Sequence, residues 1–288
     1  QQVAWILLGF LISFIVMFFN TKFLWIMTPF LYILGLGLMI LPIIFYSESL
    51  VASTGAKNWV AFHGVTLFQP SEFMKISYIL MLSRVVVKFL QQNKNYERTF
   101  ALDLFLIVKL ALYTLPVLFL LALQSDLGTA LVFAAIYCGI VLLSGVSWKI
   151  ILPIFLTVSL LFAVFMLIFI SDGGRAFLHG LGMPTYQINR ISAWLHPFEY
   201  AQTITYQQAQ GQIAIGSGGL LGQGFNVSNL LVPVRESDMI FTVIAEDFGF
   251  LGSSLVIVIY LVLIYRMLQI TIKSNNQFYT YISTGLIM

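Results

Sequence analysis

The sequence predicts an all-α protein, a polytopic bundle of transmembrane helices, and two observations support this fold class. Hydrophobic residues make up 60% of the 288 residues and charged residues only 9%, a balance far from that of a water-soluble surface. Apolar runs of about 20 residues recur along the chain; they match a hydrocarbon core of roughly 30 Å and are too long for barrel strands. Lipid is therefore the expected solvent for most of the chain.

The apolar runs place the helices in order along the chain. They are expected near residues 3–19, 23–45, 70–90, 103–123, 127–144, 149–170 and 238–266, with another beginning near Phe278. Very short connections between several of these runs predict antiparallel neighbours. We expect a single transmembrane domain over residues 1–288. Because the chain begins and stops inside apolar runs, we also expect further segments beyond both ends.

Residues 171–237 form a long polar stretch that is expected to fold against the helices. Lys and Arg are concentrated in and beside residues 20–22, 91–102, 145–149 and 266–277, which the positive-inside rule places in the cytoplasm. Strict alternation then makes 171–237 an extracytoplasmic segment of a multi-pass cell-membrane protein.

Composition also excludes some functions. A formal net charge of +3 is too small to indicate a nucleic-acid binder. The single cysteine, Cys138, excludes a disulfide framework and a cysteine-based metal site.

The ionisable residues near the membrane gather at the predicted outer face. Charged groups at such depth cost several kcal/mol and are candidates for function. Arg and Lys there suit a phosphate-bearing ligand. The acidic members and Lys75 belong to helix ends or turns, and the arginines belong to the polar segment: Glu72, Lys75, Asp126, Asp238, Glu246, Arg175, Arg190 and Arg235.

Ordinary structural roles compete with these functional ones. Glu72 and Lys75, three residues apart, fit an ion pair at a helix start after Pro70 as well as a functional role. For Asp126, an N-cap of the following helix is favoured over catalysis. Asp238 is the exception, because its place at the junction of water and apolar chain favours a general base.

Other features have simpler interpretations. The run AIGSGGLLGQG at 214–224 favours tight packing over phosphate binding, because no strand precedes it. Trp59 and Trp194 fit an interfacial aromatic belt. Arg84 is expected to snorkel from its helix, without a site role.

Four extended motifs resemble one family of membrane proteins. They are FQPSEFMK at 68–75, QSDLGTA at 124–130, YQQAQGQIAIGSGGLLGQG at 206–224 and VPVRESDMIFTVIAEDFGFLG at 232–252. In this order they resemble the SEDS family, that of RodA, FtsW and SpoVE, and within it the RodA of a Gram-positive coccus. Many members have Pro at the position of Ser125 and Phe at that of Met239. The family has ten transmembrane helices, so about eight are covered here.

The resemblance implies a peptidoglycan glycosyltransferase that polymerises lipid II into glycan strands at the outer face of the cytoplasmic membrane, in cell elongation and shape maintenance. In the family, the residue matching Asp238 is essential for polymerisation. Positions matching Glu72, Lys75, Trp59 and Gln69 are important to the cavity. The resemblance also implies a class B penicillin-binding protein, a transpeptidase, as partner.

The expected chemistry is an inverting transfer from an undecaprenyl-pyrophosphate-linked disaccharide-peptide. An acceptor hydroxyl attacks the anomeric carbon while Asp238 takes the proton. Lys75, Arg190 and Arg235 would stabilise charge on the departing pyrophosphate.

A divalent cation, Mg²⁺ or Mn²⁺, is a further candidate for that role, with Asp126 and Glu246 as candidate ligands.

Two other function classes stay open beside the enzyme. A polyprenyl-linked lipid flippase or transporter would need ionisable residues across both leaflets, whereas the inner halves of the helices carry little beyond Arg84, Lys88 and Lys109. A scaffold for a partner enzyme would need no acid at Asp238. The charge distribution favours the enzyme.

Overall fold

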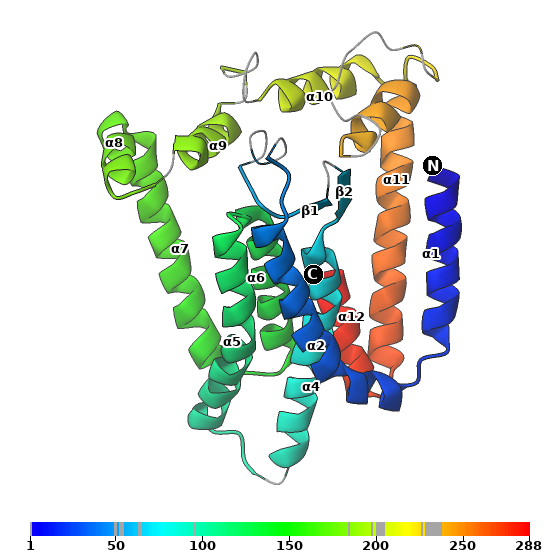
Figure 1. The fold of residues 1–288 in the computed structure, drawn as a ribbon, viewed down its shortest axis with the longest axis vertical. Coiled ribbons are helices and arrows are strands. Elements are labelled where there is room, and N and C mark those ends of the chain that lie inside the picture. Colours follow the sequence, from blue (N-terminus) through cyan, green and yellow to red (C-terminus); the bar gives the residue numbers. More distant parts are fainter. Residues whose placement is uncertain are drawn as a thin grey trace. The chain divides into compact units, whose positions relative to one another are not determined.

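The computed structural model confirms the all-α class. It describes residues 2–48, 51, 55–62, 65–94, 96–183, 185–196, 198–199, 205–225, 227 and 238–288. The elements, shown in Figure 1, are α1 (Gln2–Met17), α2 (Thr21–Ile44), β1 (Val60–Phe62), β2 (Val65–Phe68), α4 (Pro70–Gln92), α5 (Phe100–Leu123), α6 (Leu127–Leu143), α7 (Trp148–Ile170), α8 (Asp172–Gly180), α9 (Thr185–Leu195), α10 (Tyr206–Ser217), α11 (Ile240–Lys273) and α12 (Gln277–Ile287). All eight predicted helices are present, and the hairpin of β1 and β2 was not predicted.

Four helices are long and apolar enough to cross a membrane: α2, α5, α7 and α11. Helices α1 and α6 contain shorter apolar stretches. Most apolar side chains of α7 are exposed, as expected of a helix that faces lipid. The chain is therefore a multi-pass membrane protein, as predicted.

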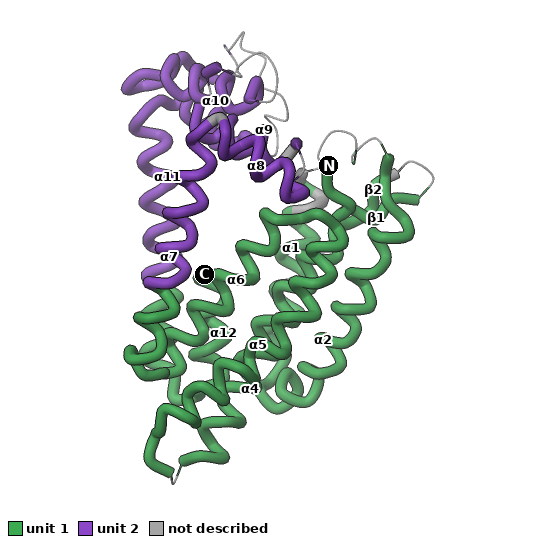
Figure 2. The backbone as a smooth tube through the Cα atoms, turned by 90° about the vertical axis from the view of Figure 1, so that its left-hand side faces the viewer, with its two compact units in different colours: residues 1–155, 267–288 green, residues 156–266 purple. Residues whose placement is uncertain are grey.

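The chain divides into two compact units, coloured separately in Figure 2. Unit 1 comprises residues 1–155 and 267–288, and unit 2 comprises residues 156–266. The single transmembrane domain stays a prediction.

Helix α4 is the central helix of unit 1, and it packs against α2, α5, α6 and α12. The Tyr78 ring is fully buried, lies edge-on to Phe133 with centroids 5.1 Å apart, and its hydroxyl lies 2.8 Å from the Thr114 hydroxyl. Gly35 lets α2 approach closely, because a Cβ there would lie 2.6 Å from the Met74 sulfur. This packing fixes α4, which carries Glu72 and Lys75 at its start.

One end of unit 1, here called the basic end, joins the connections at residues 18–20, 93–99, 144–147 and 274–276 (Figure 1). Arg98 donates to the Ser144 carbonyl at 2.6 Å and lies 3.4 Å from the buried Asp103 carboxylate. Asp103 also accepts from the Ser147 backbone N–H at 2.8 Å. These contacts confirm that the α4–α5 and α6–α7 connections share one end, as helix alternation predicted. That this end is cytoplasmic stays a prediction.

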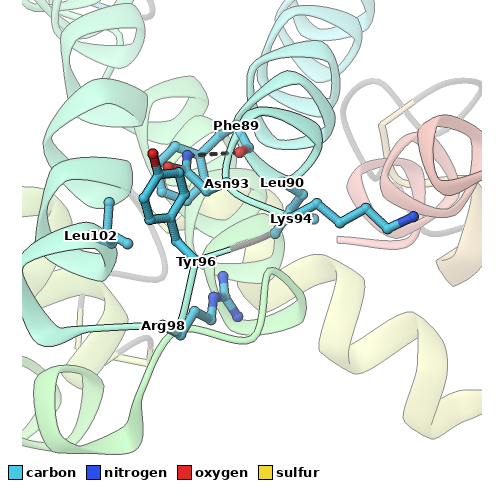
Figure 3. A pocket seen from close by; sticks show the side chains of 7 residues that line it. All are labelled: Phe89, Leu90, Asn93, Lys94, Tyr96, Arg98 and Leu102. Atoms are coloured by element: carbon cyan, nitrogen blue, oxygen red, sulfur yellow. Dashed lines mark hydrogen bonds between the residues drawn. The ribbon is translucent and has the colours of Figure 1, made fainter.

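A small pocket of about 250 Å³ lies at the basic end, lined by Phe89, Leu90, Asn93, Lys94, Tyr96, Arg98 and Leu102. Figure 3 shows that the Lys94 ammonium points away from Arg98. Arg98 is occupied by its carbonyl and carboxylate partners. The pocket thus presents little free positive charge.

Candidate functional site

The opposite end of unit 1, here called the hairpin end, carries the β1–β2 hairpin. The two strands are antiparallel, with Val60 opposite Phe68 and Phe62 opposite Val65. Trp59 directly precedes β1 and is 40% exposed, and Gln69 directly follows β2. The hairpin therefore brings two of the predicted site residues to one end of unit 1.

Asp126 connects the hairpin to the turn between α5 and α6. As the N-cap of α6, it accepts from the Thr129 backbone N–H at 3.1 Å and from the Thr129 hydroxyl at 2.8 Å. Its second oxygen also accepts from the Asn58 amide at 2.8 Å and makes a longer 3.5 Å contact with the Gln69 amide. The N-cap prediction is confirmed, and the buried carboxylate also holds two residues that flank the hairpin.

Gln124 fixes the same junction from the other side. Its backbone carbonyl accepts from the Lys57 N–H at 2.8 Å, and its buried side-chain amide donates to the Met39 carbonyl at 2.6 Å. The Met39 carbonyl belongs to α2, close to its end at Ile44. The hairpin end is therefore held by buried polar contacts as well as by packing.

Glu72 and Lys75 form an ion pair at the start of α4, with nitrogen and oxygen 2.8 Å apart. Pro70 occupies the first turn of the helix, and Glu72 is favourably placed near the positive end of the helix dipole. The pair is open to its surroundings, since the Glu72 side chain is 62% exposed and that of Lys75 28%. The pairing is confirmed, and the functional role stays a prediction.

In unit 2, Asp238 lies in the turn that leads into α11, and its side chain is exposed. Two further carboxylates, Glu246 and Asp247, follow on α11 and are buried. Asp247 was not singled out from the sequence, and its Oδ1 has no hydrogen-bond partner among the described residues.

Helix α11 is broken at Gly249, which has φ 63° and ψ −159°. In a continuous helix, the N–H groups of residues 250 and 251 would donate to the carbonyls of Glu246 and Asp247. Here these two N–H groups and two carbonyls bond instead to residues 218–224, which we call the glycine segment.

The exchange is reciprocal. Phe250 N–H donates to Gly219 O at 2.9 Å and Leu251 N–H to Leu220 O at 3.2 Å. Gln223 N–H donates to Glu246 O at 2.9 Å and Gly224 N–H to Asp247 O at 3.2 Å.

Tight packing accompanies these bonds. A Cβ added at Gly218 or Gly222 would overlap the carbonyl oxygen of Ala245 or Asp247. The packing interpretation of the glycine run is confirmed, and it explains why glycine is needed at both positions.

A pocket of about 370 Å³ lies in unit 2. Its lining comes from α9, α10 and the start of α11, and consists of Trp194, Gln208, Gly211, Gln212, Ile215, Met239 and Thr242. Met239 is the neighbour of Asp238 in the chain. An indole face and amide groups are suited to a polar, hydroxyl-bearing ligand. Trp194 was assigned to an interfacial belt in the sequence analysis, because the other residues of this pocket come from segments that are distant in the chain.

The remaining site predictions are only partly placed by the structure. Arg190 is exposed on α9 of unit 2, and Arg235 lies outside the described residues. Because Asp238 and Arg190 belong to unit 2 while Glu72 and Lys75 belong to unit 1, their convergence stays a prediction. Among the described residues, no three His, Cys, Asp or Glu side chains form a group that could hold a metal ion.

The chain matches known proteins along its whole length. The family profile of FtsW, RodA and SpoVE, described as "Cell cycle protein", matches residues 1–288. Peptidoglycan glycosyltransferase MrdB of Escherichia coli is 30% identical over 266 residues, 90% of this chain and 64% of MrdB. A probable peptidoglycan glycosyltransferase FtsW of Borreliella burgdorferi is 29% identical over 254 residues, 87% of this chain and 63% of that protein. The chain thus spans a little less than two thirds of these relatives.

Solved structures show the same fold. A chain of a peptidoglycan synthase complex, in a study of polymerization and crosslinking, superposes with a TM-score of 0.71 at 24% identity, covering all of this chain and 73% of that one. The rod shape determining protein RodA of Thermus thermophilus gives a TM-score of 0.59 at 24% identity, covering all of this chain and 70% of RodA. With its helices, motifs and full-length profile match, the chain belongs to the SEDS family of FtsW, RodA and SpoVE.

Proposed function

We propose that this protein is a peptidoglycan glycosyltransferase that polymerises lipid II at the extracytoplasmic face of the cell membrane. The observation that carries the proposal is the pocket of about 370 Å³ whose lining includes Met239, the residue after Asp238, together with Trp194, Gln208 and Gln212. The names of the relatives from Escherichia coli and Borreliella burgdorferi support the same activity. An elongation role is part of the proposal and rests on the likeness to RodA.

In the proposed reaction, Asp238 is the general base. Its exposed carboxylate takes the proton of an acceptor sugar hydroxyl as that oxygen forms a bond to the anomeric carbon of the donor. The bond from this carbon to the pyrophosphate oxygen breaks on the opposite side, so the configuration inverts. The leaving group keeps its bonding electron pair and stays anchored by its polyprenyl chain.

Cations stabilise the negative charge that develops on the pyrophosphate. Lys75, Arg190 and Arg235 are proposed for this role. Lys75 is held by Glu72 at 2.8 Å, so its ammonium is oriented while its side chain keeps 28% exposure.

The pocket wall is proposed to position the sugar. Stacking on the Trp194 indole and hydrogen bonds to the amides of Gln208 and Gln212 would orient a saccharide whose polyprenyl tail remains in lipid. A class B penicillin-binding protein is the proposed partner, which would crosslink the strands as they form.

The test is polymerisation of purified lipid II by the full-length protein with its partner, followed by gel analysis of the glycan strands. Asp238→Ala is expected to lower the rate by at least a hundredfold, since a general base contributes about 10²–10⁴-fold. Glu199→Ala is the matched control, because it removes another exposed carboxylate of the same unit outside the pocket. Full activity of Asp238→Ala, with the control also active, would refute the assignment.

A further inference from the structure

The strongest unexplained feature lies in unit 1, away from the proposed catalytic residues. Three cations, Arg84 and Lys88 of α4 and Lys109 of α5, line one pocket of about 240 Å³. The pocket is completed by Pro29, Met81, Val85 and Tyr113. In the sequence these three cations lie within a stretch of 26 residues, from 84 to 109, and the packing of α4 against α5 brings them together.

The pocket lies inside the span of the helices. At 1.5 Å per residue, Arg84 is about 12 Å from the end of α4 at Gln92, and Lys109 is about 14 Å from the start of α5 at Phe100. Both ends belong to the basic end of unit 1. Because each helix is only about 5 Å longer than a hydrocarbon core of roughly 30 Å, the backbones of Arg84 and Lys109 lie well within the apolar layer, and that of Lys88 lies near its edge.

In the described part of the chain, the charges in this pocket have no acidic counterpart. Among the described residues, none that lines the pocket is a carboxylate, and no ion pair involves Arg84, Lys88 or Lys109. Arg84 lies over the Trp25 ring, 5.3 Å from its centroid, and its Nη1 is buried without a hydrogen-bond partner in the described part of the chain. Lys109 lies over Phe105 at 5.7 Å.

Aromatic faces offset the charges only in part. A cation–π contact contributes about 0.5–2 kcal/mol, less than the several kcal/mol that a charge within the apolar layer costs. Three like charges around one cavity also repel each other. An anion that binds between them would relieve both costs.

We propose that this pocket binds the phosphate group of an anionic phospholipid from the leaflet at the basic end. A water needs about 10–15 Å³ of such a cavity, so 240 Å³ accommodates a phosphate group with some hydration. Long Arg and Lys side chains reach toward the headgroup level from such depth. Basic pockets between transmembrane helices are known binding sites for lipid headgroups.

A lipid suits the pocket better than a free anion. Pro29, Met81 and Val85 give it an apolar wall, against which an acyl chain can lie. An inorganic phosphate would have to leave water for this depth without such compensation. The pocket in Figure 3 lacks the same free charge, because Arg98 there already holds Asp103 and a carbonyl.

The test uses native mass spectrometry of the full chain, released from detergent with phosphatidylglycerol or phosphatidylcholine as the probe lipid. The wild-type protein is expected to retain one phosphatidylglycerol in preference to phosphatidylcholine. Each cation near a lipid headgroup contributes about 1 kcal/mol, so a single Gln substitution should weaken that binding about fivefold. The triple variant Arg84→Gln, Lys88→Gln and Lys109→Gln should weaken it roughly a hundredfold.

A second triple variant provides the matched control. Lys22→Gln, Lys149→Gln and Lys273→Gln remove the same charge from exposed positions outside the pocket, and should retain the tight lipid. If the first triple variant fails to fold, the single variants Lys88→Gln and Lys109→Gln and the charge-preserving Arg84→Lys still test the pocket. Arg84→Lys should keep most of the affinity.

The proposal would be overturned by equal retention of phosphatidylglycerol and phosphatidylcholine, or by an equal loss in both triple variants. Equally tight binding of inorganic phosphate would also overturn it, because it would indicate a general anion site. A clear preference for a polyprenyl phosphate over phosphatidylglycerol would also overturn the assignment to a bulk phospholipid.

Discussion

The substitution Gly249→Ala, which adds one methyl group, tests the break in α11. The backbone there has φ 63° and ψ −159°, a region that is essentially restricted to glycine. The added Cβ would overlap the Gly222 nitrogen and the Leu220 carbonyl. Because both obstacles are backbone atoms, no side-chain rotation relieves the overlap. We expect Gly249→Ala to straighten α11 and release the glycine segment.

The free-energy cost of Gly249→Ala can be worked out from the hydrogen bonds that it removes. The bent helix makes four bonds with the glycine segment, and a straight helix would regain two internal ones at residues 250 and 251. The net loss is two bonds of about 1 kcal/mol each, or about 2 kcal/mol. Remaining bent would cost alanine about 1–3 kcal/mol in backbone conformation, in addition to the overlap.

The assay is amide hydrogen exchange of the full-length protein in detergent. In Gly249→Ala, the amides of Gln223 and Gly224 should exchange roughly thirtyfold faster, which corresponds to about 2 kcal/mol. Those of Phe250 and Leu251 should stay protected, because they regain helical acceptors. Unchanged protection at 223 and 224 would refute the reasoning.

Gly216→Ala is the matched control for this experiment. Gly216 belongs to α10, and a Cβ there meets no atom within 4 Å. Its substitution should leave the exchange of the glycine segment unchanged.

Two further predictions concern the hairpin end. Asp126→Ala should lower the free energy of unfolding by about 2–4 kcal/mol, measured by thermal unfolding, because it removes the N-cap and leaves polar partners such as Asn58 without an acceptor. A change below about 1 kcal/mol would contradict the role of this carboxylate as the shared acceptor. Glu72→Gln combined with Lys75→Met should change stability by less than about 1 kcal/mol, because the Glu72 side chain is 62% exposed and water screens the ion pair. The same double variant should lose lipid II polymerisation, and a variant that retains full activity would show that the pair is only structural.

The helices were predictable because their physical cause is local. An apolar run long enough for the hydrocarbon layer must satisfy its own backbone, so α5 and α7 lie within three residues of their predicted bounds. The N-cap role of Asp126 was equally local, since the cap and its partner Thr129 are three residues apart.

The features that escaped prediction depend on contacts between distant segments. The break at Gly249 needs carbonyl and amide groups from about 30 residues upstream, and no local pattern at 249 announces it. Trp194 and Gln208 line one pocket only because α9 and α10 fold as they do, and the sequence showed these helices merely as a polar stretch. The short strands β1 and β2 carry exposed apolar residues such as Phe62, so their alternation was hidden beside the longer helical runs.

The shared carboxylate of Asp126 changes how variants of the α5–α6 turn should be interpreted. Through Gln69 it touches the residue just before α4, so its loss can displace Lys75, although no contact joins the two residues directly. A variant of Asp126 is therefore expected to lose activity through displacement of Lys75, even if the aspartate contacts neither substrate nor metal. Asp126→Asn, which keeps an oxygen for the cap, separates the two explanations: displacement predicts partial recovery, whereas a required negative charge predicts none.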